Sequence, residues 1–140
     1  MKNLSNKVVV ITGAGSGIGR ALAVNLAGKG ARLALSDVNE DGLGETVELA
    51  VKAGSPDVHT ARLDVSDKEA FASYATEVAE HFGQVNVVIN NAGVALAGEV
   101  TDLTYEDMEW IVGINFWGVV YGTKEFLPHL IASGDGHVVN

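Results

Sequence analysis

Residues 12–19 read Thr-Gly-Ala-Gly-Ser-Gly-Ile-Gly and join a short apolar run, Val8–Ile11, to a helix start at Arg20. An apolar run without alternation is typical of a strand buried on both faces of a parallel sheet. Glycines after such a strand permit a tight turn and a close approach of backbone to a ligand, and the helix N-terminus that follows offers free N–H groups to a phosphate. The segment therefore predicts a pyrophosphate-binding loop.

The glycine spacing is Gly13-x-x-x-Gly17-x-Gly19. It differs from the common Gly-x-Gly-x-x-Gly, whose third glycine, counted from Gly13, would fall on Ile18. The alternative is a glycine-rich turn that only connects a strand to a helix.

Further short apolar runs follow at intervals typical of repeated βα units of roughly 30 residues. They predict strands at 7–11, 31–36, 58–63, 85–90 and 137–140. Amphipathic segments lie between them, and right-handed crossovers then place helices on both faces of the sheet. We predict an α/β fold with a doubly wound parallel sheet.

Two of the helices have recognisable ends. Asn39 precedes a helix that we expect to run to about Ala53 and to stop at Gly54. Ser66 and Glu69 have the spacing of a capping box, which predicts a helix from Ser66 to about Phe82.

The last helix is expected from Thr104, a plausible N-cap, to about Ile131. It carries more than one apolar stripe, which predicts burial on several sides. Pro128 should kink it or divide it in two.

Composition narrows the classes of partner. Nine basic and eighteen acidic residues give a net charge of −9, whereas binding to nucleic acid or to an anionic membrane requires a basic surface. We therefore expect neither partner. The chain has no cysteine, and its four histidines lack metal-ligand spacing. A cytoplasmic protein without a disulfide or a metal site is expected, since residues 1–11 also lack a signal-peptide or membrane-spanning pattern.

Asp37 ends the second predicted strand, twenty residues after Gly17. A carboxylate there can accept hydrogen bonds from the ribose hydroxyls of NAD and would repel the 2′-phosphate of NADP. Ser16 and Val38, where a compensating cation could lie, are uncharged, which favours NAD. The alternative is a helix N-cap, although Asn39 already offers one.

Three motifs together resemble the classical short-chain dehydrogenases/reductases. They are Thr-Gly-x-x-x-Gly-x-Gly at 12–19, Asn-Asn-Ala-Gly at 90–93, and Asn115 in the long helix. The resemblance implies a Rossmann-like three-layer sandwich that binds NAD. It implies that the cofactor is bound by Gly13, Ser16, Gly17, Ile18, Gly19, Asp37, Asp64, Val65, Asn90, Ala92 and Gly93.

Within that set, the resemblance places the pyrophosphate at the glycine loop and the adenine at Asp64 and Val65. The nicotinamide side then lies along residues 90–93. From the residues alone, 90–93 is a strand end whose two amides can bridge neighbouring strands, followed by a glycine that lets a ligand approach closely; the alternative is a structural turn. Asp64 could likewise belong only to the turn before the next helix.

Asn115 is the one residue of this sequence to which the resemblance gives a catalytic role: it would hold a water in a proton relay. The residues themselves also allow a buried structural amide that satisfies backbone groups at a helix bend.

The catalytic pair of the family is absent from these residues. Family chemistry requires a serine after the fifth strand and a Tyr-x-x-x-Lys pair, but the residues four positions after Tyr74, Tyr105 and Tyr121 are Val78, Glu109 and Glu125. We therefore interpret 1–140 as the NAD-binding domain at the N-terminal end of a longer single-domain enzyme, with a fold that is incomplete after the fifth strand. Alone, the chain is expected to be inactive.

The resulting hypothesis is an NAD-dependent oxidoreductase that interconverts an alcohol and a carbonyl compound by hydride transfer. The apolar long helix favours a homo-oligomer, a dimer or a tetramer. The alternative is a non-catalytic NAD-binding module that is complete at 140 residues.

Overall fold

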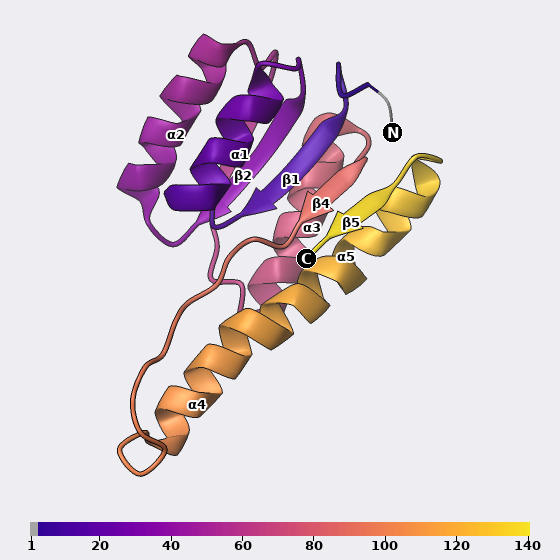
Figure 1. The fold of residues 1–140 in the computed structure, drawn as a ribbon. Coiled ribbons are helices and arrows are strands. Elements are labelled where there is room, and N and C mark those ends of the chain that lie inside the picture. Colours follow the sequence, from indigo (N-terminus) through magenta and orange to yellow (C-terminus); the bar gives the residue numbers. More distant parts are fainter. Residues whose placement is uncertain (1–2) are drawn as a thin grey trace.

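Five strands form one parallel sheet in the computed structural model, which describes residues 3–140 (Figure 1). The strands are β1 (Val8–Thr12), β2 (Arg32–Asp37), β3 (Val58–Arg62), β4 (Val87–Ile89) and β5 (His137–Val139). Their order across the sheet is β3-β2-β1-β4-β5. The chain therefore moves outward in one direction from β1 and then in the other, as the predicted doubly wound fold requires.

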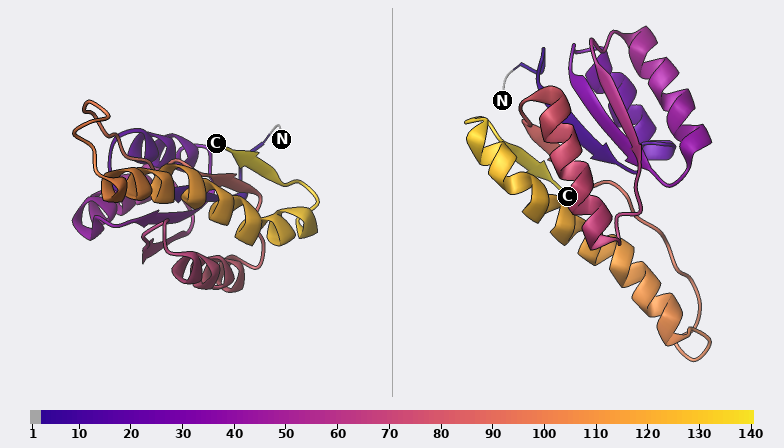
Figure 2. Two further views of the ribbon diagram at one scale, coloured as in Figure 1. Left: turned by 90° about the horizontal axis from the view of Figure 1, so that it is seen from below. Right: turned by 180° about the vertical axis from the view of Figure 1, so that it is seen from behind.

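Helices cover both faces of this sheet. They are α1 (Gly17–Ala27), α2 (Glu40–Ala53), α3 (Lys68–Phe82), α4 (Tyr105–Val112), the π-helix η1 (Gly113–Trp117) and α5 (Gly118–Ala132). Helices α1 and α2 lie on one face, and α3 and α5 lie on the other (Figures 1 and 2). The arrangement is the three-layer Rossmann-like sandwich.

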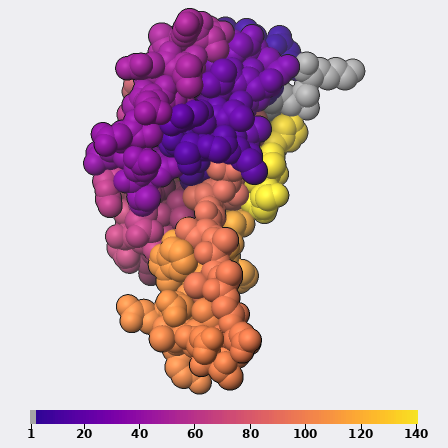
Figure 3. All heavy atoms as spheres, turned by 60° about the vertical axis from the view of Figure 1, so that its left-hand side comes forward, coloured from indigo at the N-terminus to yellow at the C-terminus, as the bar shows by residue number. Residues whose placement is uncertain are grey.

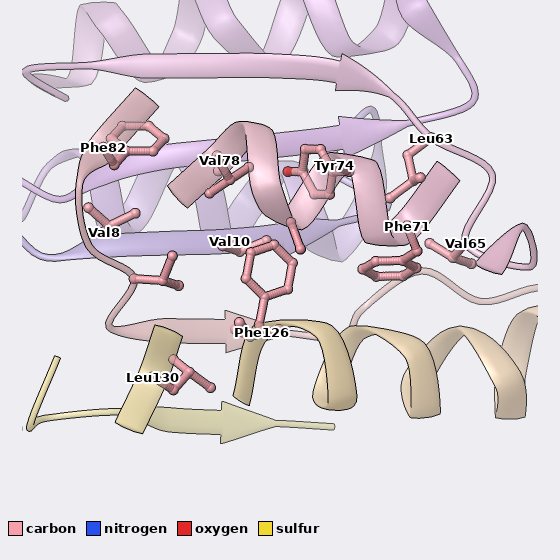
Figure 4. Packing of buried hydrophobic residues seen from close by; sticks show 14 residues of the cluster. Val8, Val10, Leu63, Val65, Phe71, Tyr74, Val78, Phe82, Phe126 and Leu130 are labelled. Atoms are coloured by element: carbon pink, nitrogen blue, oxygen red, sulfur yellow. The ribbon is translucent and has the colours of Figure 1, made fainter. Parts of the chain in front are cut away.

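Strand β1 supplies the core on both sides of the sheet. Val8 and Val10 pack toward α3 and α5, where Phe71 and Phe126 fill the space between the layers (Figure 4). Val9 and Ile11 belong to the second cluster, under α1 and α2. All five β1 residues are buried, which confirms that the unbroken apolar run reflects burial on both faces.

The ends of α2 are as predicted, but the start of α3 is not. Asn39 caps α2 by accepting a hydrogen bond from the Gly42 N–H at 3.0 Å. The capping box at Ser66 is wrong, because Asp67 is the N-cap of α3 and accepts from the Ala70 N–H at 2.9 Å. The Ser66 hydroxyl donates to the Asp64 carboxylate at 2.6 Å, so that it is engaged before the helix begins.

The long helical segment begins at Thr104 as predicted, with a capping box formed by Thr104 and Asp107. The prediction that Pro128 divides this segment is wrong, since α5 continues past Pro128 to Ala132. Pro128 and Lys124, whose carbonyl loses its helical partner, are both exposed, and water can solvate that carbonyl. The helical hydrogen-bond pattern changes instead at η1.

The prediction that the long helical segment is buried on several sides is wrong for α4 and η1. No residue of α4 or η1 is buried, and Trp110, Phe116 and Trp117 expose 47%, 57% and 45% of their surface. Helix α4 and the loop before it project away from the sheet, and Figure 3 shows them extending from the main body. Among residues 3–140, no helix is long and apolar enough to cross a membrane.

Candidate functional site

A cavity of about 410 Å³ lies at the carboxyl ends of the strands. The order of the sheet reverses between β1 and β4, and ligands of open α/β sheets bind at this switch point. The cavity is lined by Gly13, Ser16, Gly17, Ile18, Asp37, Val38, Leu63, Asp64, Val65, Asn91, Ala92, Gly93, Val94 and Ile114. Loops that are far apart in sequence therefore meet in one site.

The three motif glycines, Gly13, Gly17 and Gly19, have different roles. At Gly13 (φ +66°), an added Cβ would lie 2.8 Å from Ala92 Cα, so this position requires glycine for both conformation and space. At Gly17 (φ +53°), an added Cβ would meet no atom within 4 Å, so the backbone borders open space. Gly19 is buried beneath the Gly13 carbonyl and does not line the cavity. It allows α1 to begin directly under the loop.

Asn91 joins the loop to β4. Its Nδ2 donates to the Thr12 and Gly13 carbonyls at 2.9 and 3.2 Å. The Thr12 hydroxyl oxygen accepts from the N–H groups of Asn91 and Ala92 at 3.1 and 3.0 Å. These contacts confirm that an amide of this motif bridges neighbouring strands.

Asn90 is buried behind the cavity and is not among the residues that line it. Its Nδ2 donates to Thr123 Oγ1 at 3.2 Å and to Asn140 Oδ1 at 2.8 Å. Its Oδ1 has no hydrogen-bond partner among the described residues and lies against Gly122 of α5. The structure therefore places Asn90 in the joint between β4, α5 and the end of β5.

Asp37 lies at the cavity, and its carboxylate is tied to the loops around it. Oδ2 accepts from the Gly15 N–H at 2.8 Å, and Oδ1 accepts from the Asn39 N–H at 2.9 Å. The interpretation of Asp37 as an N-cap is wrong, because Asn39 caps α2.

Asp64 and Val65 also line the cavity, beside the start of α3. One Asp64 oxygen accepts from the Ser66 N–H at 3.0 Å as well as from its hydroxyl. Asp64 thus also has the role in the turn that the residues alone allowed.

Asn115 lies in η1 and is exposed, so the expectation of a buried amide is wrong. Its Oδ1 accepts from the Val94 N–H and its Nδ2 donates to the Val94 carbonyl, both at 2.8 Å. The side chain does not line the cavity, but it fixes Val94, which does. The amide satisfies backbone groups of a loop, not of the helix bend.

The family follows from a direct comparison. A profile of the family described as short chain dehydrogenase matches residues 7–140. The chain belongs to this family. It is 57% identical over its whole length to SadH of Mycobacterium tuberculosis, of which it covers 50%. It is 41% identical over 138 residues, 99% of its length, to human epidermal retinol dehydrogenase 2, of which it covers 45%.

Solved members of the family have the same fold. A short-chain dehydrogenase/reductase from Burkholderia phymatum, in complex with NAD, superposes with a TM-score of 0.94 at 39% identity, over 100% of this chain and 50% of that one. An alcohol dehydrogenase from Thermococcus sibiricus, complexed with 5-hydroxy-NADP, gives 0.89 at 37% identity, over 96% and 57%. Binding of NAD is thus consistent with the family. The chain spans about half the length of the relatives that it matches.

The cavity contains five residues that were not predicted as site residues: Val38, Leu63, Asn91, Val94 and Ile114. Val38 and Leu63 directly follow β2 and β3, so the rule that ligands bind beyond the carboxyl ends of strands could have identified them. Asn91 is part of the quoted motif. The places of Val94 and Ile114 in the cavity depend on the contact between Asn115 and Val94, which no local sequence pattern predicts. Among the described residues, no group of three or more potential metal ligands occurs.

Proposed function

We propose that this chain is the NAD-binding half of an oxidoreductase that interconverts an alcohol and a carbonyl compound by hydride transfer. The observation that carries the proposal is the single cavity at the switch point. It brings together the glycine loop, an acidic residue at the end of β2 and the segment 91–94. A dinucleotide needs all three: donors for its pyrophosphate, an acceptor for its ribose and a wall for its reactive ring.

The described residues fit such a ligand. Gly17 leaves open space beside the backbone where a pyrophosphate must approach closely, and Ser16 and Ile18 flank it. Val38, Leu63 and Val65 offer apolar contacts to an adenine ring, next to Asp64. Ala92, Gly93, Val94 and Ile114 would line the nicotinamide side. Asn90 belongs to the proposed site through the strand joint that supports this wall.

Asp37 favours NAD over NADP. An ionised carboxylate has about four acceptor positions, so the two N–H groups that it already binds leave room for ribose hydroxyls. A 2′-phosphate would meet that negative charge directly. None of the described residues that line the cavity is Lys or Arg, so no nearby cation would compensate for it.

Bound NAD would accept a hydride from an alcohol or, in its reduced form, donate one to a carbonyl. The residues of this chain bind and orient that cofactor. Asn115 holds Val94 against the site, and the role that the resemblance implies for it, in a proton relay, is part of this proposal. Proton transfer to the substrate is assigned to the rest of the whole protein, because these residues contain no Tyr-x-x-x-Lys.

The whole protein is proposed to be a cytoplasmic homo-oligomer, a dimer or a tetramer. Trp110, Phe116 and Trp117 on α4 and η1 are large apolar side chains left exposed, of the kind that interfaces cover. A non-catalytic module complete at 140 residues is not favoured, because the relatives that match the entire chain are dehydrogenases and oxidoreductases about twice as long.

Titration of the purified protein with NADH and NADPH, followed by calorimetry, tests the cofactor assignment. We expect NADH to bind at least about tenfold more tightly, a difference of about 1.4 kcal/mol. Equal binding would contradict the role of Asp37, and the absence of binding of either nucleotide would refute the proposed function.

A further inference from the structure

The glycine loop is held on the side that faces α2 by a side chain that does not line the cavity. The Arg20 guanidinium donates to the Gly15 carbonyl at 2.7 Å and to the Gly42 carbonyl at 3.1 Å. Its Nε donates to Thr46 Oγ1 at 3.0 Å, and its Nη2 pairs with the Glu45 carboxylate at 2.9 Å. One planar group thus connects the loop, α1 and α2.

Thr46 binds Ala14, the loop residue before Gly15. Its side chain is buried, and its hydroxyl, as donor, lies 2.8 Å from the Ala14 carbonyl and 3.1 Å from the Gly42 carbonyl, while its oxygen accepts from Arg20. We call Arg20 and Thr46 the loop clamp. The clamp binds the carbonyl oxygens of two consecutive loop residues, Ala14 and Gly15.

Binding of the carbonyls fixes the N–H groups on the other side of the loop. In a trans peptide the C=O and the following N–H point in opposite directions, and none of the described peptide bonds is cis. The Ala14 carbonyl points to Thr46, and the Gly15 N–H points away from it and donates to Asp37 at 2.8 Å. The Gly15 carbonyl points to Arg20, so the Ser16 N–H must point away from α2.

Ser16 lines the cavity, and its N–H has no acceptor among residues 3–140. A donor that is held away from the clamp and left without a protein partner is available to an anionic ligand. The clamp therefore controls two features of the site from behind: the direction of the Ser16 N–H and, through Gly15, the position of the Asp37 carboxylate.

We propose that Arg20 and Thr46 are positioning residues for dinucleotide binding and for the choice between NAD and NADP. The inference rests on the proposed function, since it assigns the clamp to the same cavity. Lys cannot reproduce these contacts, because the guanidinium donates from two nitrogens, Nε to Thr46 and Nη2 to the carbonyls, whereas Lys carries a single ammonium group. The Glu45 partner is exposed and contributes little.

The test compares two clamp variants with two matched controls. Thr46→Val removes the hydroxyl at nearly constant volume, and Thr46→Ser restores it. Arg20→Lys removes the planar group, and Glu45→Gln removes only the ionic partner of Arg20. Each protein is measured by calorimetric titration with NADH and with NADPH. Amide hydrogen exchange at Gly15 is measured in the ligand-free protein, and thermal unfolding reports on overall stability.

For Thr46→Val and Arg20→Lys we expect the NADH dissociation constant to rise about tenfold or more, the NADH preference to shrink, and Gly15 exchange to accelerate by a similar factor. Thr46→Ser and Glu45→Gln should change each value by less than about fivefold. A merely structural clamp would lower the melting temperature without changing the NADH/NADPH ratio or Gly15 exchange, and that result would overturn the proposal. If the wild-type protein binds neither nucleotide, the proposed function fails, and unchanged Gly15 exchange would separately refute the clamp.

Discussion

At the scale of single residues, the site is built by side chains that serve both the fold and the cavity. Asp37 illustrates this, because its carboxylate binds the Gly15 and Asn39 N–H groups and also faces the cavity. The sequence predicts its place at the end of a strand, but not its bond to Gly15, which depends on how the loop closes against β2. Variants of Asp37 must therefore separate charge from support of the loop.

Asp37→Asn should weaken NADH binding modestly and reduce discrimination against NADPH about tenfold, because the amide keeps an acceptor for a backbone N–H but loses the negative charge. Asp37→Ala should weaken both nucleotides further, since it also releases Gly15. Calorimetric titration of the two variants measures both effects. An unchanged NADH/NADPH ratio in Asp37→Asn would show that another group selects the cofactor.

Gly17→Val should abolish cofactor binding while the protein still folds. The added side chain enters space that is open in the protein, at a positive φ that costs about 1–3 kcal/mol. Gly134→Val is the matched control, since Gly134 (φ +69°) also has no atom within 4 Å of an added Cβ and lies outside the cavity. Equal loss of NADH binding in both variants would attribute the effect to backbone strain alone.

At the scale of elements, the sequence predicts what local pattern determines. The five strands lie close to the predicted ranges. Burial on both faces explains the unbroken apolar run of β1, Val8–Ile11, whereas β3 is only partly buried and β5 is exposed. The start of α3 is displaced by one residue because Asp64 engages Ser66. The π-helix η1 could not be predicted, since Asn115 at its centre pairs with Val94, 21 positions earlier. In the site, the residues at strand ends could be predicted from the sequence, whereas the contacts that α5 makes with other elements could not.

Helix α5 packs so closely on the joint below it that Gly122 has no room for a methyl group. An added Cβ would collide with Asn90 Oδ1 and would lie 3.0 Å from Phe71 Cζ, both in buried side chains. Gly122→Ala should lower the free energy of unfolding by about 1–3 kcal/mol, as overpacking does. Gly44→Ala, in α2 with open space around it, should instead stabilise by about 0.5–1 kcal/mol. Urea unfolding of both variants measures these changes, and a stabilised Gly122→Ala would contradict the contact.

At the scale of the whole molecule, helices cover both faces of the sheet, while one edge of it is exposed. Helices α1 and α2 pack on β1, β2 and β3 on one face, and α3 and α5 pack on β3 and β4 on the other. Strand β5, at the edge of the sheet, is exposed, and α4 extends beyond the sheet (Figure 2). The α3/α5 side nevertheless has a dense aromatic centre, in which Tyr74 contacts Phe71 and Phe126 edge to face at 6.3 and 6.0 Å between ring centroids. Stability of this layer therefore depends on keeping that centre uncharged.

Tyr74 makes this dependence testable through alkaline pH. Burial raises the pKa of the Tyr74 hydroxyl well above its ordinary value of 10.0. The unfolded chain then loses the proton near pH 10 while the folded protein retains it, so stability falls as pH rises above 10, by about 1.4 kcal/mol per pH unit for one proton. Tyr74→Phe removes this contribution and keeps the ring contacts. Urea unfolding at pH 7 and near pH 11 should give similar stabilities at neutral pH and a smaller alkaline loss for the variant. Equal alkaline losses in the two proteins would mean that the folded layer accepts a charged Tyr74.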